Sequence, residues 1–85
     1  MRIFITGGSG YLGHNFIEYA LKEDPQLLIT ALSRSTIADD KILQAAGNVR
    51  SGKERIRIIR GDMHDENALR EGVNEADVIV HLAAK

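Results

Sequence analysis

The sequence predicts an α/β fold, a doubly wound parallel sheet in which strands and helices alternate as β-α-β-α-β-α-β. Short apolar runs alternate with stretches whose apolar residues recur at helical spacing, and this alternation favours a parallel sheet with right-handed crossovers. A glycine-rich turn separates the first apolar run from the first helical stretch. The third apolar run carries arginines, which places it at a sheet edge and favours the strand order 3-2-1-4.

The first strand and the first helix flank the glycine-rich turn. Residues 2–6 form an apolar run closed by Gly7-Gly8, which predicts a buried strand. Residues 11–22 place apolar side chains along one helical face and polar side chains along the other. Asp24-Pro25 is expected to end this helix, because the residue before a proline disfavours helical dihedral angles.

Two further strands follow, with a helix between them. Residues 27–32 are mostly apolar and predict a second buried strand. Residues 37–46 show a weaker helical pattern, whose stop is expected at Gly47. Residues 55–60, RIRIIR, alternate over part of their length, as a strand near a sheet edge does.

The last part of the chain predicts a short helix and a fourth strand. Asp65 is expected to N-cap a helix that runs to Glu71, with Gly72 after it. Residues 77–82 contain VIVHL, which is apolar enough for a strand buried on both faces. In the order 3-2-1-4 the fourth strand should have a fifth beside it. We therefore interpret residues 1–85 as the first half of a longer domain.

Composition narrows the class of protein. The chain has 85 residues and a formal net charge of −1, so neither nucleic acid nor an anionic membrane is expected as a partner. It has no cysteine, which excludes disulfides and is compatible with a reducing compartment. Its first strand leaves no room for a signal peptide, and its apolar runs are shorter than the roughly 18 residues that span a bilayer. We expect a cytoplasmic protein. The histidines lack the spacing of metal ligands, so no metal site is expected.

The turn after the first strand reads Thr6-Gly7-Gly8-Ser9-Gly10-Tyr11-Leu12-Gly13. Its early glycines permit a tight turn with positive φ, Gly10 lets the backbone approach a pyrophosphate, and Gly13 allows close helix–strand packing. Phosphates would then meet the N–H groups at the helix N-terminus. The turn could instead serve only to reverse the chain, but a strand before it and a helix after it favour cofactor binding. The candidate cofactor-binding residues here are Gly7, Gly10, Tyr11, Leu12 and Gly13.

Thr6-Gly7-x-x-Gly10-x-x-Gly13 resembles the TGxxGxxG motif of extended short-chain dehydrogenases/reductases, the NAD(P)-dependent epimerase/dehydratase family. The resemblance implies a Rossmann-type fold, of which residues 1–85 would be a partial NAD(P)-binding domain, truncated before the catalytic and substrate-binding parts. Two later motifs also fit the family, each at the end of a strand. Gly61-Asp62-Met63 stands where the family has an aspartate that receives the adenine amino group, and His81-Leu82-Ala83-Ala84 resembles an HxAA-type stretch beside the cofactor.

These two motifs add candidate cofactor-binding residues, and each has a simpler alternative. Asp62 could only order its loop, and the alanines could only pack. Together with the glycine turn they lie in the family's order, at strand ends where ligands bind in open α/β sheets. The added candidates are Asp62, Met63, Leu82, Ala83 and Ala84.

The end of the second strand bears on the choice of cofactor. Folds that prefer NAD place Asp or Glu there, roughly 20 residues after the glycines, to hold the ribose 2′-hydroxyl. This chain has Ser33 at that position, followed by Arg34. Serine can hydrogen-bond a 2′-phosphate and arginine can pair with it, whereas a carboxylate would repel it. The pattern favours NADP, with NAD as the second choice. The alternative is that Arg34 is only a solvated surface residue.

No catalytic residue is expected in this chain. The family's chemistry uses a Tyr-x-x-x-Lys pair, but Tyr11 is followed at the fourth place by Asn15, and Tyr19 by Glu23. The resemblance therefore implies the NADP-leaning dinucleotide-binding segment of an epimerase, dehydratase or reductase, with a nucleotide sugar as one candidate substrate. A non-catalytic NAD(P)-binding regulatory or redox-sensing module of the same fold is the alternative, and an interaction domain without ligand is a third reading. We also expect homo-oligomers or other self-association through the apolar edge of the last strand.

Overall fold

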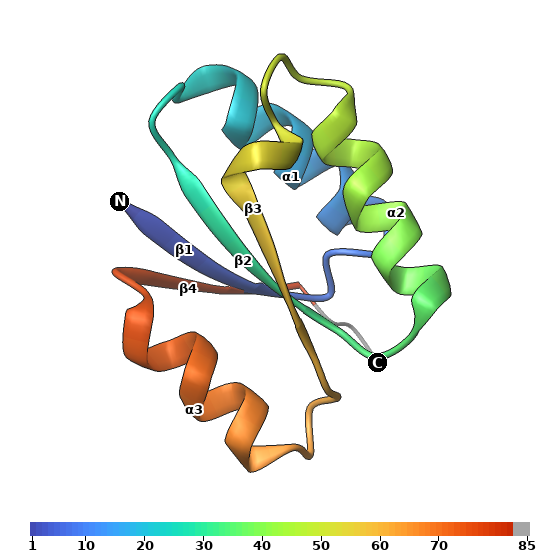
Figure 1. The fold of residues 1–85 in the computed structure, drawn as a ribbon, viewed down its shortest axis with the longest axis vertical. Helices are drawn as coiled ribbons and strands as arrows, with labels where there is room; N and C mark the ends of the chain where they lie inside the picture. Colours follow the sequence, from blue (N-terminus) through green and yellow to red (C-terminus); the bar gives the residue numbers. More distant parts are fainter. Residues whose placement is uncertain (83–85) are drawn as a thin grey trace.

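The computed structural model describes residues 1–82 and contains a four-stranded parallel sheet in the order β3-β2-β1-β4 (Figure 1). The strands are β1 (Arg2–Thr6), β2 (Leu28–Ser33), β3 (Ile56–Arg60) and β4 (Val78–His81). The helices are α1 (Tyr11–Glu23), α2 (Thr36–Gly47) and α3 (Glu66–Glu75), and a short 3-10 helix, η1 (Lys53–Arg55), precedes β3. The predicted α/β class, the alternation of elements and the strand order are confirmed.

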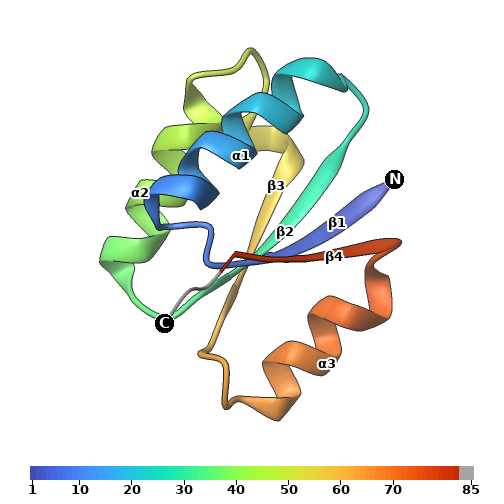
Figure 2. The same ribbon diagram turned by 180° about the vertical axis from the view of Figure 1, so that it is seen from behind.

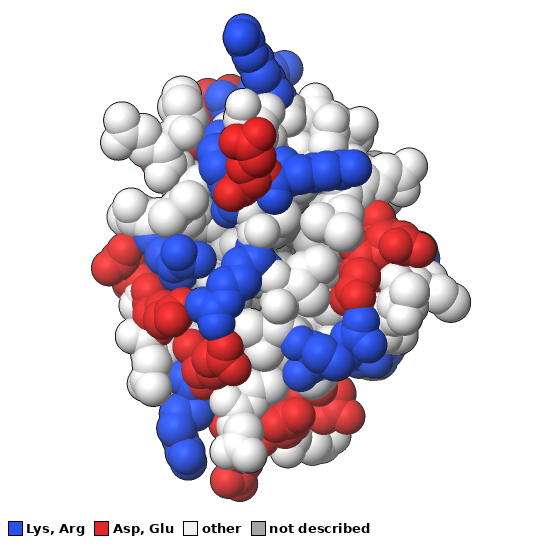
Figure 3. All heavy atoms as spheres, in the orientation of Figure 1, with Lys and Arg blue, Asp and Glu red and all other residues white. Residues whose placement is uncertain are grey.

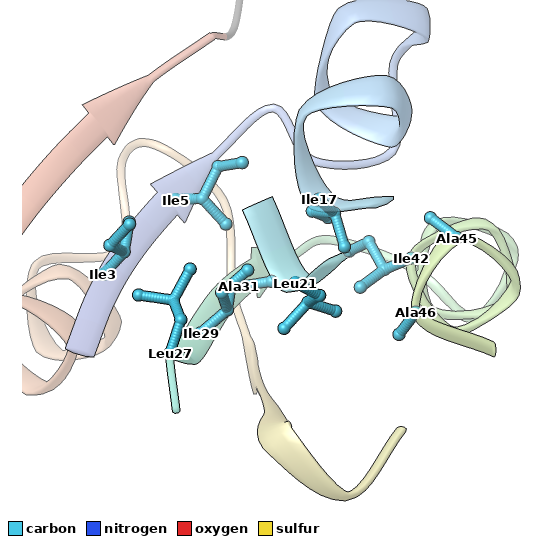
Figure 4. Close-up of a cluster of buried hydrophobic side chains, with 10 residues drawn as sticks. All are labelled: Ile3, Ile5, Ile17, Leu21, Leu27, Ile29, Ala31, Ile42, Ala45 and Ala46. Atoms are coloured by element: carbon cyan, nitrogen blue, oxygen red, sulfur yellow. The ribbon is translucent and has the colours of Figure 1, made fainter. Parts of the chain in front are cut away.

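The sheet is covered on both faces. Helices α1 and α2 lie on one face and α3 on the other, as the two opposite views show (Figures 1 and 2). Alternate residues of β1 point to opposite faces, so Ile3 and Ile5 belong to the core under α1 and α2, and Phe4 belongs to the core under α3. Figure 4 shows the larger core, which also contains Ile17, Leu21, Leu27, Ile29, Ala31, Ile42, Ala45 and Ala46.

The two outer strands of the sheet differ in how they meet solvent. Strand β3 lies at one edge, as its arginines predicted, and Arg57 pairs there with Glu71 and Glu75 of α3. Strand β4 pairs with β1, and within residues 1–82 no strand lies on its other side. Val78 and Ile79 are accordingly 42% and 53% exposed. The prediction that this strand is buried on both faces is wrong for these two residues.

Most predicted element ends agree with the structure to within a residue or two, but α3 does not. Asp65 is its N-cap, as predicted, and accepts a hydrogen bond from Ala68 N at 3.0 Å. The helix then runs through Gly72 to Glu75, whereas the sequence predicted an end at Glu71. A Cβ at position 72 would lie 2.3 Å from Phe4 Cε1. Gly72 therefore allows α3 to approach the sheet, and it does not end the helix.

The surface carries both signs of charge. Figure 3 shows basic and acidic side chains interspersed over one face, in line with the net charge of −1. Within residues 1–82 no helix is both long and apolar enough to cross a membrane.

Candidate functional site

A cavity of about 390 Å³ lies at the carboxyl ends of the strands, beside the start of α1. Its size falls in the range of small-molecule sites, and its position is the one where open α/β sheets bind ligands. The glycine turn contributes Gly7, Gly10, Tyr11, Leu12 and Gly13 to its lining. The ends of the other three strands contribute Ser33, Arg34, Asp62, Met63 and Leu82. The cavity thus brings together every candidate residue up to Leu82, and Ala83 and Ala84 lie outside the described residues.

Four further residues line this cavity without having been predicted: Ser9, Leu32, Ala38 and Gly61. Three of them adjoin a predicted residue in the sequence, so a wider window around each motif would have found them. Ala38 is different, because it lies inside α2 and nothing in the local sequence points it toward the glycine turn.

A second cavity, of about 530 Å³, lies at the amino ends of the strands, between the end of α1 and the loop that follows α2. Arg55 lines it, and its guanidinium donates to Leu21 O at 2.6 and 3.0 Å and to Asp24 O at 3.0 Å. These carbonyls end α1 and need donors from outside the helix. Although this cavity is larger, it contains none of the predicted site residues, and its Arg55 is engaged in capping a helix. We therefore take the cavity at the carboxyl ends as the candidate site.

The glycines of the turn have different structural tasks. Gly7 has φ of 80°, a conformation that favours glycine. A Cβ at Gly13 would lie 2.1 Å from Gly7 O and 2.5 Å from Gly8 Cα, so α1 packs against the turn itself, not against the strand as predicted. At Gly10 φ is −78°, and a Cβ would meet only Gly7 O, at an ordinary 3.6 Å. Folding therefore does not require glycine at position 10, whereas a ligand lying against the cavity-lining backbone would.

The start of α1 provides hydrogen-bond donors at the same place. Gly10 is the N-cap, and within the described residues no side-chain hydrogen bond caps this end. The first intrahelical bond runs from His14 N to Gly10 O at 2.8 Å, so the earlier N–H groups of the helix have no intrahelical acceptor. Together with the helix dipole, these groups favour an anion such as a pyrophosphate. The turn and the helix end therefore fit a dinucleotide.

The end of β2 is organised by Asp39, which was not among the predicted site residues. Ser33 is only 2% exposed, and its hydroxyl donates to Asp39 Oδ1 at 2.5 Å and approaches Ser35 O at 3.1 Å. Asp39 lies in the first turn of α2 and also pairs with Arg60 at the end of β3. Arg34, by contrast, is exposed and lines the cavity. Asp39 could have been suspected from the sequence, because it is an acidic residue in the first turn of the helix that follows this strand.

Two hydrogen bonds order the remaining cavity wall. Asp62 Oδ1 accepts from His64 N at 2.8 Å, so Asp62 does order its loop, and it also lines the cavity. Thr6 Oγ1 lies 2.5 Å from His81 Nδ1, which joins the ends of β1 and β4 beside the glycine turn. Thr6 and His81 face each other in the strand register, a contact that depends on the register of β1 against β4 and was not predicted.

The chain matches known proteins along nearly its whole length. A family model described as GDP-mannose 4,6 dehydratase matches residues 4–85. The dTDP-glucose 4,6-dehydratase of Mycobacterium tuberculosis is 34% identical over 85 residues, which cover 100% of this chain and 24% of the relative. Among solved structures, dTDP-glucose 4,6-dehydratase from Bacillus anthracis in complex with NAD aligns with a TM-score of 0.75 and 26% identity, over 100% of this chain and 27% of that one.

A second solved relative is also a complex with NAD. UDP-glucuronic acid 4-epimerase from Bacillus cereus aligns with a TM-score of 0.64 and 26% identity, over 99% of this chain and 27% of that one. The chain thus spans about a quarter of the length of the relatives it matches.

Proposed function

Because the chain belongs to the GDP-mannose 4,6 dehydratase family, within the extended short-chain dehydrogenases/reductases, we propose that its cavity holds the adenosine and pyrophosphate parts of a nicotinamide dinucleotide. The observation that carries this proposal is Gly10. Its dihedral angles suit any residue and a Cβ there has room, yet glycine stands at the cavity wall beside the N-terminus of α1. A pyrophosphate in contact with the backbone explains that choice.

Different cavity-lining residues would contact different parts of the dinucleotide. Gly10, whose N–H already donates to Gly7 O at 3.2 Å, lets the pyrophosphate approach the backbone, and the first N–H groups of α1 bind it. Asp62 Oδ1 accepts a hydrogen bond from His64 N, and the other carboxylate oxygen of Asp62 accepts one from the adenine amino group. Met63 and Leu82 supply apolar surface beside the cofactor. The bound dinucleotide would supply hydride transfer at its nicotinamide ring.

The cofactor preference rests on Arg34. Ser33 has one hydroxyl hydrogen, which is already given to Asp39 or Ser35, so Arg34 is left to recognise a 2′-phosphate. A hydrogen bond to a charged group contributes about 1.5–3 kcal/mol. At 1.4 kcal/mol per factor of ten, this corresponds to roughly a 10- to 150-fold preference for 2′,5′-ADP over ADP. We therefore propose NADP as the preferred cofactor and NAD as the second.

Calorimetric titration of 2′,5′-ADP and of ADP tests this function. The wild-type chain should bind both ligands, and Arg34→Ala should weaken 2′,5′-ADP selectively. Arg50→Ala is the matched control, because Arg50 is an exposed arginine that lines the other cavity. A wild-type chain that binds neither ligand would refute the dinucleotide site. An Arg34→Ala variant that keeps the wild-type ratio of the two affinities would show that Arg34 is only a solvated residue.

The activity of the whole protein is a wider proposal. The names of the relatives support a dehydratase or an epimerase that acts on a nucleotide sugar. Such an enzyme needs an acid/base tyrosine in a Tyr-x-x-x-Lys pair, which residues 1–85 do not contain. The reading frame is the test: this pair downstream of Lys85 supports the enzyme, and a continuation without it supports the non-catalytic regulatory module. We also propose self-association through β4. The cytoplasmic location stays a prediction.

A further inference from the structure

Three residues from three elements meet behind the wall of the cavity. Ser33 ends β2, Asp39 lies in the first turn of α2, and Arg60 ends β3. Asp39 uses Oδ1 to accept the Ser33 hydroxyl at 2.5 Å and Oδ2 to pair with Arg60. Of the three, only Ser33 lines the cavity. Asp39 is thus separated from the cavity by a single side chain.

The hydrogen-bond arrangement limits what Ser33 can offer a ligand. A serine hydroxyl has one hydrogen and two lone pairs, and here its hydrogen is directed to Asp39 or to Ser35 O at 3.1 Å. Only the lone pairs remain for another partner. A ribose 2′-hydroxyl can donate to such an acceptor, whereas a 2′-phosphate oxygen has no hydrogen to give. The orientation imposed by Asp39 therefore favours the unphosphorylated ribose.

The charge of Asp39 acts in the same direction. Its side chain is 21% exposed and that of Arg60 is 53% exposed, so the anion is the less solvated partner of the pair. Solvent screens an exposed cation more strongly than a partly buried anion, and the pair leaves a net negative field at Ser33. This field opposes the attraction between Arg34 and a 2′-phosphate.

We propose that Asp39 is a positioning residue that sets cofactor specificity, by holding Ser33 as an acceptor and placing a negative charge behind the ribose subsite. In folds that prefer NAD, an acid at the end of β2 holds the ribose 2′-hydroxyl. Asp39 would provide the negative charge of such an acid from the first turn of α2. The inference rests on the proposed dinucleotide site. It deepens that proposal, because the preference between NADP and NAD then depends on two opposing residues: Arg34 attracts the 2′-phosphate and Asp39 repels it.

The test compares 2′,5′-ADP and ADP on variants of the two charged residues. Asp39→Asn keeps an oxygen that can accept from Ser33 but removes the charge. It should raise the ratio of 2′,5′-ADP affinity to ADP affinity about tenfold, which corresponds to ~1.4 kcal/mol. Arg60→Gln should lower the same ratio, because it leaves the charge of Asp39 unpaired. Asp40→Asn is the matched control, because Asp40 is the adjacent acid of α2 and is exposed.

The opposite directions of the two effects separate specificity from stability. A purely structural role for the ion pair would weaken both ligands alike and leave the ratio unchanged in both variants. An unchanged ratio in either variant, or a rise in Arg60→Gln, overturns the proposal, and Arg60→Gln decides the matter alone if Asp39→Asn does not fold. A wild-type chain that binds neither nucleotide is a different result, because it refutes the dinucleotide site itself, and the inference falls with it.

Discussion

Two alanine substitutions in the glycine turn should separate ligand binding from folding. At Gly10 the backbone has φ of −78° and ψ of 175°, and an added methyl would contact only Gly7 O, at 3.6 Å. At Gly13 the methyl would lie 2.1 Å from the same oxygen. We expect Gly10→Ala to fold and to lose nucleotide affinity, and Gly13→Ala to lose stability.

The magnitudes follow from these contacts. Alanine in place of glycine at a compatible position stabilises a protein by about 0.4–1 kcal/mol, because it restricts the unfolded chain. In the complex the Gly10 methyl would occupy space beside the pyrophosphate. If this overpacking costs about 1–3 kcal/mol, affinity falls about 5- to 150-fold. For Gly13→Ala the backbone must move, which costs about 3 kcal/mol or more. In a domain of this size that lowers Tm by about 12–24 °C.

The assay pairs thermal unfolding by circular dichroism with calorimetric titration of ADP. Wild-type affinity for ADP in Gly10→Ala would refute the argument that a ligand contacts this backbone. An unchanged Tm in Gly13→Ala would refute the packing of α1 against the turn. Each variant is the control for the other, because both make the same chemical change within one turn.

Two further predictions concern the sheet. Ile79 is 53% exposed on the edge strand β4, so Ile79→Lys should reduce self-association measured by light scattering. Tyr19→Lys, at a 65% exposed position on α1, is the control and should leave self-association unchanged. A wild-type chain that is monomeric at high concentration would contradict this role for β4. In α3, Gly72→Ala places a methyl 2.3 Å from Phe4 Cε1 and should cost about 1–3 kcal/mol in urea unfolding. Gly47→Ala is its control, since its methyl would meet the flexible end of Lys53 at 2.9 Å; equal effects of the two substitutions would count against the contact between Gly72 and Phe4.

The elements, and the convergence of the motifs that follow the strands, could be predicted from local sequence patterns. Apolar periodicity reflects which side of a strand or helix is buried, so the alternation of elements could be predicted from neighbouring residues alone. Local signals also placed the end of α1 at Asp24 and the N-cap of α3 at Asp65. Parallel strands bring all their carboxyl ends to one edge of the sheet. The motifs that follow them therefore had to converge, and those within the described residues line one cavity.

The contacts that join separate elements could not be predicted, because they depend on how those elements pack. Gly72 looked like a helix stop, but it lies inside α3 because the Phe4 ring, from the first strand, occupies the space that a Cβ would need. The acid at position 39 was visible in the sequence, but its contact with the Ser33 hydroxyl was not. Asp39 reaches it only because α2 turns back over the end of β2, where Arg60 of β3 also arrives. Local periodicity does not predict such contacts, because they depend on the register of the strands and on how the helices pack against the sheet.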